Sequence, residues 1–172
     1  MAEEKTGALI IFERETNLSE VIRTGTIVDS NVSAQLLRLL FVKNTPLHDG
    51  AVIIRGNKIY AAACYLPLSN NLHLNKDLGT RHRAGIGISE STDCISVIVS
   101  EETGYISMAR GGVLTRNITP DILRKLLREG LAPQDKGKKA GSKVAGLFRL
   151  ADRVSKKRKD KKKRDGDGNG KA

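Results

Sequence analysis

Two short segments of this chain carry residue types that could act together on a phosphate ester. Residues 79–83 read Gly-Thr-Arg-His-Arg and precede a run typical of a helix, 84–90. Thr80 is predicted to cap this helix, whose first turn would offer free backbone N–H groups and the positive end of its dipole to an anion. Arginine adds forked, permanently charged donors that match phosphate oxygens. We therefore predict an anion site at the start of this helix.

The second segment contributes a carboxylate. Asp49 lies between a Pro-Leu pair, at positions 46 and 47, and a strand-like run, 51–55. A carboxylate beside a phosphate clamp is the minimum set of groups for phosphoryl or nucleotidyl transfer, in which positioning and charge neutralisation supply most of the catalysis. The alternative for Asp49 is a structural one, because an Asp-Gly pair often simply forms a turn.

The net positive charge belongs to the last part of the chain. The formal charge is +11, and residues 136–172 hold 15 of the 30 Lys and Arg but 4 of the 19 Asp and Glu. Residues 1–135 therefore carry 15 charges of each sign and are neutral. With three Phe, three Tyr and no Trp, the chain also offers little surface on which bases could stack. Nucleic acid is thus not expected to be the main partner.

The cysteines and the apolar runs indicate where the chain resides. Cys64 and Cys94 lie in apolar, strand-like runs without C-x-x-C spacing, which favours buried thiols in a reducing compartment over a disulfide or a metal site. No apolar stretch approaches the roughly 18–20 residues that a membrane span requires, and no signal peptide is recognisable. The chain itself is predicted to be soluble and cytoplasmic.

Hydrophobic patterns and turn residues predict an α/β fold with a mixed sheet. Strands interleaved with helices support this fold class, and Gly56-Asn57 is a hairpin signal. The predicted strands are 7–13, 26–28, 51–55, 58–65, 94–100 and 105–110, and the predicted helices are 17–23, 33–42, 80–90 and 119–130. Gly130 is expected to end the last helix.

The same patterns predict one globular domain, with a central mixed β-sheet flanked by helices. It is expected to span residues 7–131, after a short N-terminal leader, 1–6. Residues 132–172 are basic and then Gly-rich and polar, so they cannot bury enough apolar surface to offset chain entropy. We predict a disordered tail there.

Both chemical segments resemble the paired signature of the diadenylate cyclase (DAC, or DisA N-terminal) domain family. The first matching block is Pro46-Leu47-His48-Asp49-Gly50-Ala51, the second is 79–83, and the resemblance continues through 62–69, 87–90 and 99–104. It is strongest for the membrane-anchored CdaA class, also called DacA. The resemblance implies an enzyme, a nucleotidyltransferase that condenses two ATP into the bacterial second messenger cyclic di-AMP and releases two pyrophosphates. The implied cofactor is a divalent metal, Mn²⁺ or Mg²⁺, with Co²⁺ as a further candidate.

The resemblance also implies site residues. Asp49 would coordinate metal and activate the ribose 3′-hydroxyl, and His48 and Glu102 would be further metal ligands. The implied substrate contacts are Gly50, Ala51, Tyr65, Leu66, Thr80, Arg81, His82, Arg83, Ser100 and Glu102. Since side chains at positions 81 and 83 point in different directions on a helix, Arg81 and His82 are expected to be the closer phosphate ligands. A structural histidine at 48 and a core tyrosine at 65 are the alternatives.

Oligomer and location follow from the same resemblance. One domain holds one ATP, whereas ring closure needs two 3′-hydroxyls that each attack the other nucleotide, so a face-to-face homodimer is the symmetric solution. Family members of this class carry transmembrane helices before the domain. We therefore expect residue 1 to be a truncation point and the full-length protein to lie at the cytoplasmic face of the bacterial membrane.

Two other functions use the same features. A non-catalytic sensor could bind ATP without turnover, although Asp49 together with Glu102 favours catalysis, because a pure binder has less need of metal-supporting carboxylates. The basic run 156–164 could contact anionic lipid or other polyanions, although such a run is usually a solvated tail.

Overall fold

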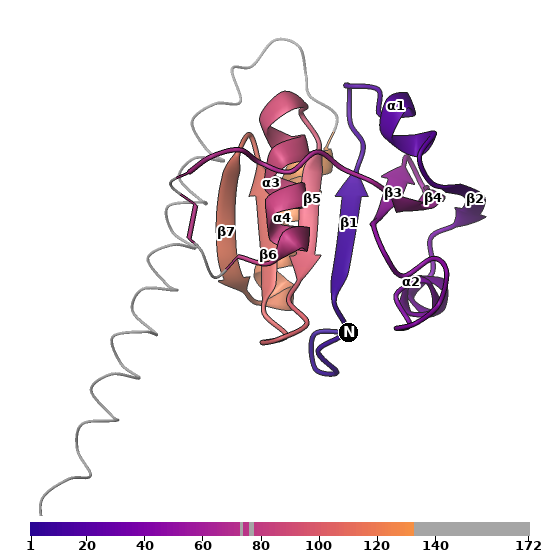
Figure 1. The fold of residues 1–172 in the computed structure, drawn as a ribbon, viewed down its shortest axis with the longest axis horizontal. Helices are drawn as coiled ribbons and strands as arrows, with labels where there is room; N and C mark the ends of the chain where they lie inside the picture. Colours follow the sequence, from indigo (N-terminus) through magenta and orange to yellow (C-terminus); the bar gives the residue numbers. More distant parts are fainter. Residues whose placement is uncertain (73, 76–77, 133–172) are drawn as a thin grey trace, which may run out of the picture. The chain divides into compact units, whose positions relative to one another are not determined.

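The computed structural model describes residues 1–72, 74–75 and 78–132 (Figure 1). Contacts between Cα atoms divide the chain into two compact units, Met1–Leu114 and Thr115–Ala172. The predicted basic tail lies outside the described residues, apart from Ala132, as do three residues of the loop before the third helix. The predicted domain boundaries therefore stay predictions.

Seven strands within the described residues form one mixed sheet, in the order β2-β4-β3-β1-β5-β6-β7. β1 and β3 run parallel, whereas β1 with β5, β2 with β4, β3 with β4 and β5 with β6 are antiparallel. The strands are β1 (Ala8–Phe12), β2 (Thr26–Asn31), β3 (Ala51–Arg55), β4 (Lys58–Cys64), β5 (Ile95–Val99), β6 (Ile106–Arg110) and β7 (Val113–Ile118). The predicted mixed α/β fold is confirmed, although β7 was not predicted.

The described residues also form four helices, α1 (Ser19–Ile22), α2 (Ala34–Leu40), α3 (Thr80–Ser91) and α4 (Pro120–Leu131). Two of them begin as their sequence predicts, because the hydroxyl of Ser33 accepts a hydrogen bond from an N–H of α2 and that of Thr119 from an N–H of α4. Within the described residues, no helix has the length and apolar character needed to cross a bilayer.

Two predicted helix boundaries are wrong by one residue. Gly79, not Thr80, is the N-cap of α3, because its extended backbone lets its carbonyl accept the N–H groups of His82 and Arg83. Thr80 is consequently the first residue inside the helix. At the other boundary, α4 passes through Gly130 and ends at Leu131.

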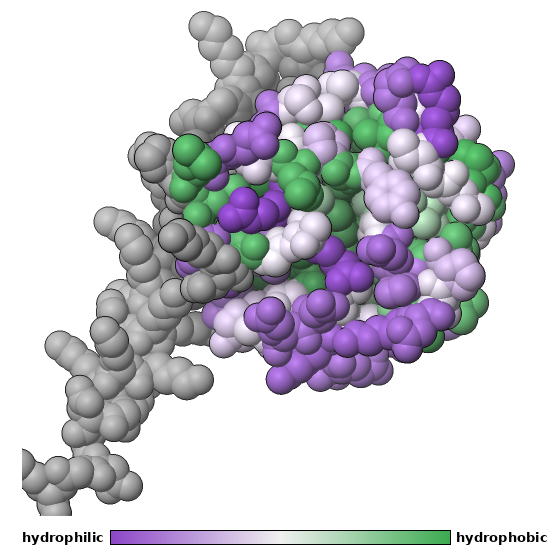
Figure 2. Space-filling view, in the orientation of Figure 1, coloured by the Kyte–Doolittle hydropathy of each residue, from purple (hydrophilic) through white to green (hydrophobic). Residues whose placement is uncertain are grey.

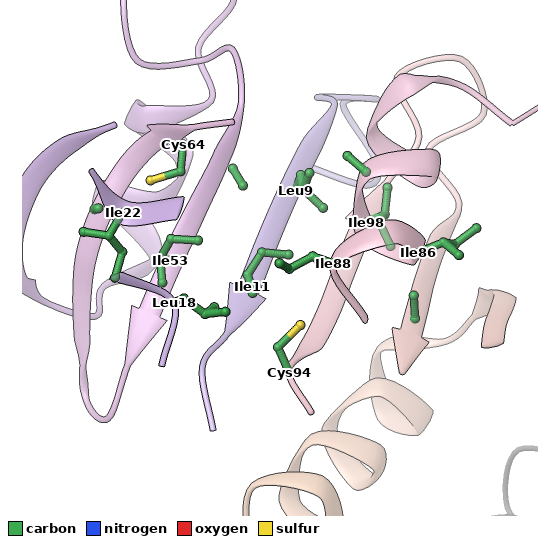
Figure 3. Close-up of a cluster of buried hydrophobic side chains, with 14 of the residues drawn as sticks. Leu9, Ile11, Leu18, Ile22, Ile53, Cys64, Ile86, Ile88, Cys94 and Ile98 are labelled. Atoms are coloured by element: carbon green, nitrogen blue, oxygen red, sulfur yellow. The ribbon is translucent and has the colours of Figure 1, made fainter. Parts of the chain in front are cut away.

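One face of the sheet packs against α1 and α3. Alternate residues of each strand point to this face, as the two-residue repeat of a strand requires. α3 lies across β1, β5 and β6 (Figure 1). The buried side chains labelled in Figure 3 are Leu9, Ile11, Leu18, Ile22, Ile53, Cys64, Ile86, Ile88, Cys94 and Ile98.

A second apolar cluster uses the other residues of the same strands. Val52 and Ile54 of β3 alternate with Ile53 and pack with Leu40 and Phe41 at the end of α2. β1 and β3 are therefore covered on both faces, which explains their nearly continuous apolar sequences.

Both cysteines are buried free thiols, as predicted. Burial raises the pKa of the Cys64 thiol from 9.0 to about 11 and also raises the pKa of Cys94, because a thiolate loses its hydration in the core. Neither thiol has the lowered pKa that marks a reactive cysteine.

We expect the free energy of unfolding to fall as pH rises above about 9. The Cys64 thiol ionises near pH 9.0 in the unfolded chain but only near pH 11 in the folded chain. The buried thiol therefore contributes fully to the free energy of unfolding below about pH 9, and this contribution is lost as pH rises toward the pKa of about 11 in the folded chain. Urea unfolding between about pH 8 and about pH 10.5 measures how steeply the free energy of unfolding falls with pH. The same slope in Cys64→Ala would contradict the assignment to this thiol.

Candidate active site

One end of the sheet gathers the residues that the sequence singled out. β1 and β3 begin at this end, and their antiparallel neighbours β5 and β4 finish there. The loop before β3, the segment after β4 and the turn after β5 therefore emerge together. We call this the Asp49 end of the sheet; in Figure 1 the start of β1 and the end of β5 mark it, at the lower ends of those two strands. Figure 2 shows, in the same orientation, hydrophilic residues along the lower margin of this face.

Arg81, in the first turn of α3, connects two of these segments. Its Nη1 donates to Oε2 of Glu101, in the turn after β5, at 2.9 Å, and its Nη2 lies 3.5 Å from the carbonyl oxygen of His48. The side chain is 22% exposed, and its Nε is buried without a hydrogen-bond partner among the described residues. An arginine with an unmet buried donor at a helix start fits a site that accepts an anion.

Asp49 is exposed in the loop that leads directly into β3. The next residue, Gly50, has a φ of +99°, and a Cβ there would lie 2.8 Å from backbone atoms of Ala63 and Cys64. Only glycine tolerates both this positive φ and this close approach, so the loop lies directly against the end of β4. The carboxylate of Asp49 thus projects from a backbone whose path is strongly constrained. Ala51 is fully buried, so its predicted contact with the substrate stays a prediction.

Tyr65 and Leu66 follow β4 at the same end of the sheet. Tyr65 is 66% exposed, so the alternative of a core tyrosine is wrong. Its backbone N–H donates to the hydroxyl of Thr24 at 2.9 Å, which holds the start of this segment. Leu66 is half-buried and packs against the core. An exposed aromatic ring beside a held aliphatic side chain is a surface on which a planar base could rest.

The side chains of His82 and Arg83 have different surroundings from that of Arg81. His82 is buried, and its Nε2 faces the hydroxyl of Ser107 on β6 at 3.5 Å. Arg83 is half-buried and forms no ion pair with any residue that the structure describes. Burial alone would favour the half-buried Arg83 over the buried His82 as a second phosphate ligand, so the predicted pair of Arg81 and His82 stays a prediction. Thr80 is exposed at the first position of α3.

Ser100 and Glu102 lie in the turn between β5 and β6. The Ser100 hydroxyl accepts the N–H of Thr103 at 3.2 Å, and its carbonyl accepts that of Gly104 at 2.9 Å. Glu102 is exposed at the tip. The turn is therefore held by its own hydrogen bonds, and the carboxylate of Glu102 faces solvent.

Among the described residues, no three His, Cys, Asp or Glu side chains lie together as a group that could hold a metal ion. The predicted ligands His48, Asp49 and Glu102 therefore do not form a complete site by themselves. His48 Nδ1 contacts the carbonyl of Thr45 at 2.6 Å, which orients the ring and leaves Nε2 for a cation. Mg²⁺ is usually held by one or two carboxylates together with substrate phosphates, a role open to Asp49, whereas the imidazole of His48 suits a transition metal better than Mg²⁺.

Sequence reasoning missed Glu101 and Gly7. The carboxylate of Glu101 pairs with Arg81 across 20 positions of sequence, and a Cβ at Gly7 would lie 2.7 Å from Nη1 of Arg81. The local sequence holds no signal for either role, because both depend on the meeting of β1, β5 and α3 in the folded chain.

The family match and the curated relatives agree with one another. The DAC family, described as "DisA bacterial checkpoint controller nucleotide-binding", matches residues 1–114. "Cyclic di-AMP synthase CdaA" of Bacillus subtilis is 52% identical over 127 residues, which are 74% of this chain and 46% of that protein. A "Diadenylate cyclase" of Listeria monocytogenes is 53% identical over 131 residues, 76% of this chain and 48% of that protein. The chain spans about half the length of these curated relatives.

Solved structures show the same fold. A double mutant of DacA from Staphylococcus aureus matches with a TM-score of 0.76 and 54% identity, over 77% of this chain and 89% of that chain. A "hypothetical membrane spanning protein" from Bacillus cereus matches with a TM-score of 0.66 and 44% identity, over 69% of this chain and 58% of that chain.

Proposed function

Because the chain belongs to the DAC family of nucleotide-binding domains, we propose that it is a diadenylate cyclase, a nucleotidyltransferase that joins two ATP into cyclic di-AMP. The observation that carries this proposal is the Asp49 end of the sheet. There the exposed carboxylate of Asp49 and the partly satisfied guanidinium of Arg81 belong to adjacent, connected segments. The names of the curated relatives support the same activity.

In this proposal the nucleotide is held by groups from three segments. The adenine rests against Tyr65 and Leu66, of which the first is exposed and the second held by the core. The triphosphate lies at the start of α3, where Thr80, Arg81 and Arg83 surround free backbone N–H groups. Gly50 contributes a backbone contact beside the buried Ala51, and Ser100 and Glu102 approach from the turn after β5.

The proposed reaction forms one bond and breaks one bond at each α-phosphate. The 3′-oxygen of one nucleotide bonds to the α-phosphorus of the other, and the bond to the bridging oxygen of the β-phosphate breaks, so pyrophosphate leaves. Asp49 accepts the proton of the 3′-hydroxyl and orients that oxygen for attack. A divalent cation, Mn²⁺, Mg²⁺ or Co²⁺, when bound, neutralises phosphate charge, and His48, Asp49 and Glu102 are the residues proposed to hold it.

The reaction also sets the proposed assembly. Each domain presents one such site, whereas the product contains two phosphodiester bonds that close a ring. Two protomers facing each other, each with one nucleotide, supply both attacking hydroxyls in a symmetric arrangement. The proposed location is the cytoplasmic face of a bacterial membrane, supported by the likeness to the "hypothetical membrane spanning protein" of Bacillus cereus. The direct test of the activity is incubation with ATP and Mn²⁺ or Mg²⁺, with products resolved by anion-exchange chromatography and mass spectrometry.

A required homodimer makes specific activity depend on protein concentration. We expect cyclic di-AMP formed per protomer to rise with enzyme concentration in the dilute range, and to level off once the dimer is fully formed. Initial rates across a dilution series, with mass photometry on the same samples, measure both quantities. Activity strictly proportional to enzyme at every dilution, from a particle of monomer mass, would contradict the face-to-face dimer.

A further inference from the structure

We propose that Glu101 is a positioning residue of this site. Its carboxylate lies next to Gly7 and holds the guanidinium of Arg81 against the loop that carries Asp49. This inference rests on the proposed function, since the site it describes is the proposed nucleotide site. Glu101 is not itself assigned to metal or nucleotide.

The contacts of Arg81 form a short chain across three segments. Glu101 Oε2 accepts Nη1 of Arg81 at 2.9 Å, and Nη2 of the same guanidinium lies 3.5 Å from the carbonyl oxygen of His48, the residue before Asp49. Of the two contacts, the one with Glu101 is the shorter and pairs opposite charges. Without it, Arg81 would keep only the longer contact among the described residues, and its guanidinium could turn away from the loop.

Gly7 provides the space in which this ion pair lies. A Cβ at Gly7 would lie 2.7 Å from Nη1 of Arg81 and 3.0 Å from both Cβ and Oε2 of Glu101. Its φ is not in the left-handed region, so a side chain at this position would be opposed by space alone and would displace the ends of Arg81 and Glu101. The start of β1 is thus shaped around the pair of Arg81 and Glu101.

A role in stability alone does not account for this arrangement. Glu101 is 51% exposed, and exposed ion pairs contribute little to folding. Lys58 and Asp29 form an ion pair of similar length, 2.8 Å, in which the carboxylate is similarly exposed (52%) but the cation is more exposed (50%) than Arg81 (22%). That pair lies at the opposite end of β4 from Tyr65. What distinguishes Glu101 is the group it holds, an arginine with one unmet buried donor beside the Asp49 loop.

Because Glu101 is negatively charged, its removal should affect kcat and the KM for ATP differently. A carboxylate beside the triphosphate site repels ATP, so its removal should not weaken ground-state binding. Loss of a positioning group should instead lower the rate of the bound complex, since small misplacements at a reacting centre cost rate. We therefore expect Glu101→Gln to lower kcat at least about tenfold while the KM for ATP stays level or falls. Gly7→Ala should lower kcat in the same way.

The experiment is steady-state kinetics of cyclic di-AMP formation by the whole chain, with a double-mutant cycle. The variants are wild type, Glu101→Gln, Arg81→Ala and the double variant, with Asp29→Asn as the control for loss of an exposed carboxylate. If Glu101 acts through Arg81, Glu101→Gln should have little further effect in the Arg81→Ala background. An unchanged kcat in Glu101→Gln, or losses that multiply in the double variant, would overturn the inference.

A second measurement works without turnover. Hydrogen exchange of the amides at positions 48–50 should be faster in Glu101→Gln than in wild type and unchanged in Asp29→Asn. Equal exchange in Glu101→Gln and wild type would overturn the inference. A wild-type chain that makes no cyclic di-AMP would overturn the proposed function instead, and the exchange comparison would still decide whether Glu101 holds the loop.

Discussion

Asp49→Asn should bind ATP and yet form cyclic di-AMP at less than about one-hundredth of the wild-type rate. The amide is nearly the size of the carboxylate but cannot accept the proton of the 3′-hydroxyl, and it is a weaker ligand for a cation. Asp49 is exposed, so the change removes no packing. The loop around it is set by Gly50 and by the contact between the Arg81 side chain and the His48 carbonyl, which the substitution leaves intact.

Product analysis by anion-exchange chromatography and mass spectrometry measures this effect, with ATP binding followed by calorimetry on the same protein. Asp29→Asn is the control, because it makes the same chemical change on an exposed residue of β2. Wild-type rates in Asp49→Asn would show that the carboxylate is a turn residue and that the proposed mechanism is wrong. If wild type binds ATP but forms no product at any protein concentration, the sensor function would replace the cyclase.

The parts of the fold that were predictable are those with a strong local signal. β1 and β3 are apolar along their whole length because both faces of each strand are buried, and Ser33 and Thr119 mark the starts of α2 and α4. β7 was not predicted because Arg116 and Asn117 interrupt the apolar pattern of its sequence. Asn117 also has a φ of +54°, which departs from regular strand geometry.

The start of α3 shows why a cap residue alone does not fix a boundary. Thr80 has the better capping side chain, yet the carbonyl of Gly79 accepts the first helical N–H groups. The cap position lies in open space, since a Cβ at Gly79 would meet nothing within 4 Å. The sequence predicted an anion site at the start of this helix, and in the structure the helix begins one residue earlier than predicted, at Thr80.

Some residues of the candidate site have a local sequence signal and others do not. Asp49 and Arg81 stand out in sequence because a carboxylate before a strand and a cationic cluster at a helix start together suit phosphate chemistry. Glu101 and Gly7, by contrast, carry no such local signal before the chain folds. Their roles depend on the order of strands, since β1 lies between β3 and β5 in the sheet. Tyr65 illustrates the same limit, because its pattern fitted either a core position or a ligand surface, and its exposure argues against the core position while the contact with substrate stays a prediction.

Gly87→Ala should lower the free energy of unfolding by about 2 kcal/mol or more relative to Gly85→Ala. Both glycines are buried in α3, and alanine should favour the helix by a similar amount, roughly 1 kcal/mol, at each position. A Cβ at Gly87 would lie 2.3 Å from the carbonyl oxygen of Pro67 and 2.6 Å from the nitrogen of Ser69. These are backbone atoms, so either α3 or the segment after Leu66 must move.

At Gly85, by contrast, a Cβ would meet only side-chain carbons of Ile98 and Leu9, at 3.0–3.3 Å. Such side chains can shift by a small amount, so Gly85→Ala should lie within about 1 kcal/mol of wild type. Urea unfolding of the three proteins measures both differences, and equal stabilities of the two variants would show that α3 is not in close contact with residues 67–69. Because the displaced segment begins at Tyr65 and Leu66, Gly87→Ala should also weaken ATP binding, whereas Gly85→Ala should not. The close approach of α3 to this segment would then serve both the fold and the proposed adenine site.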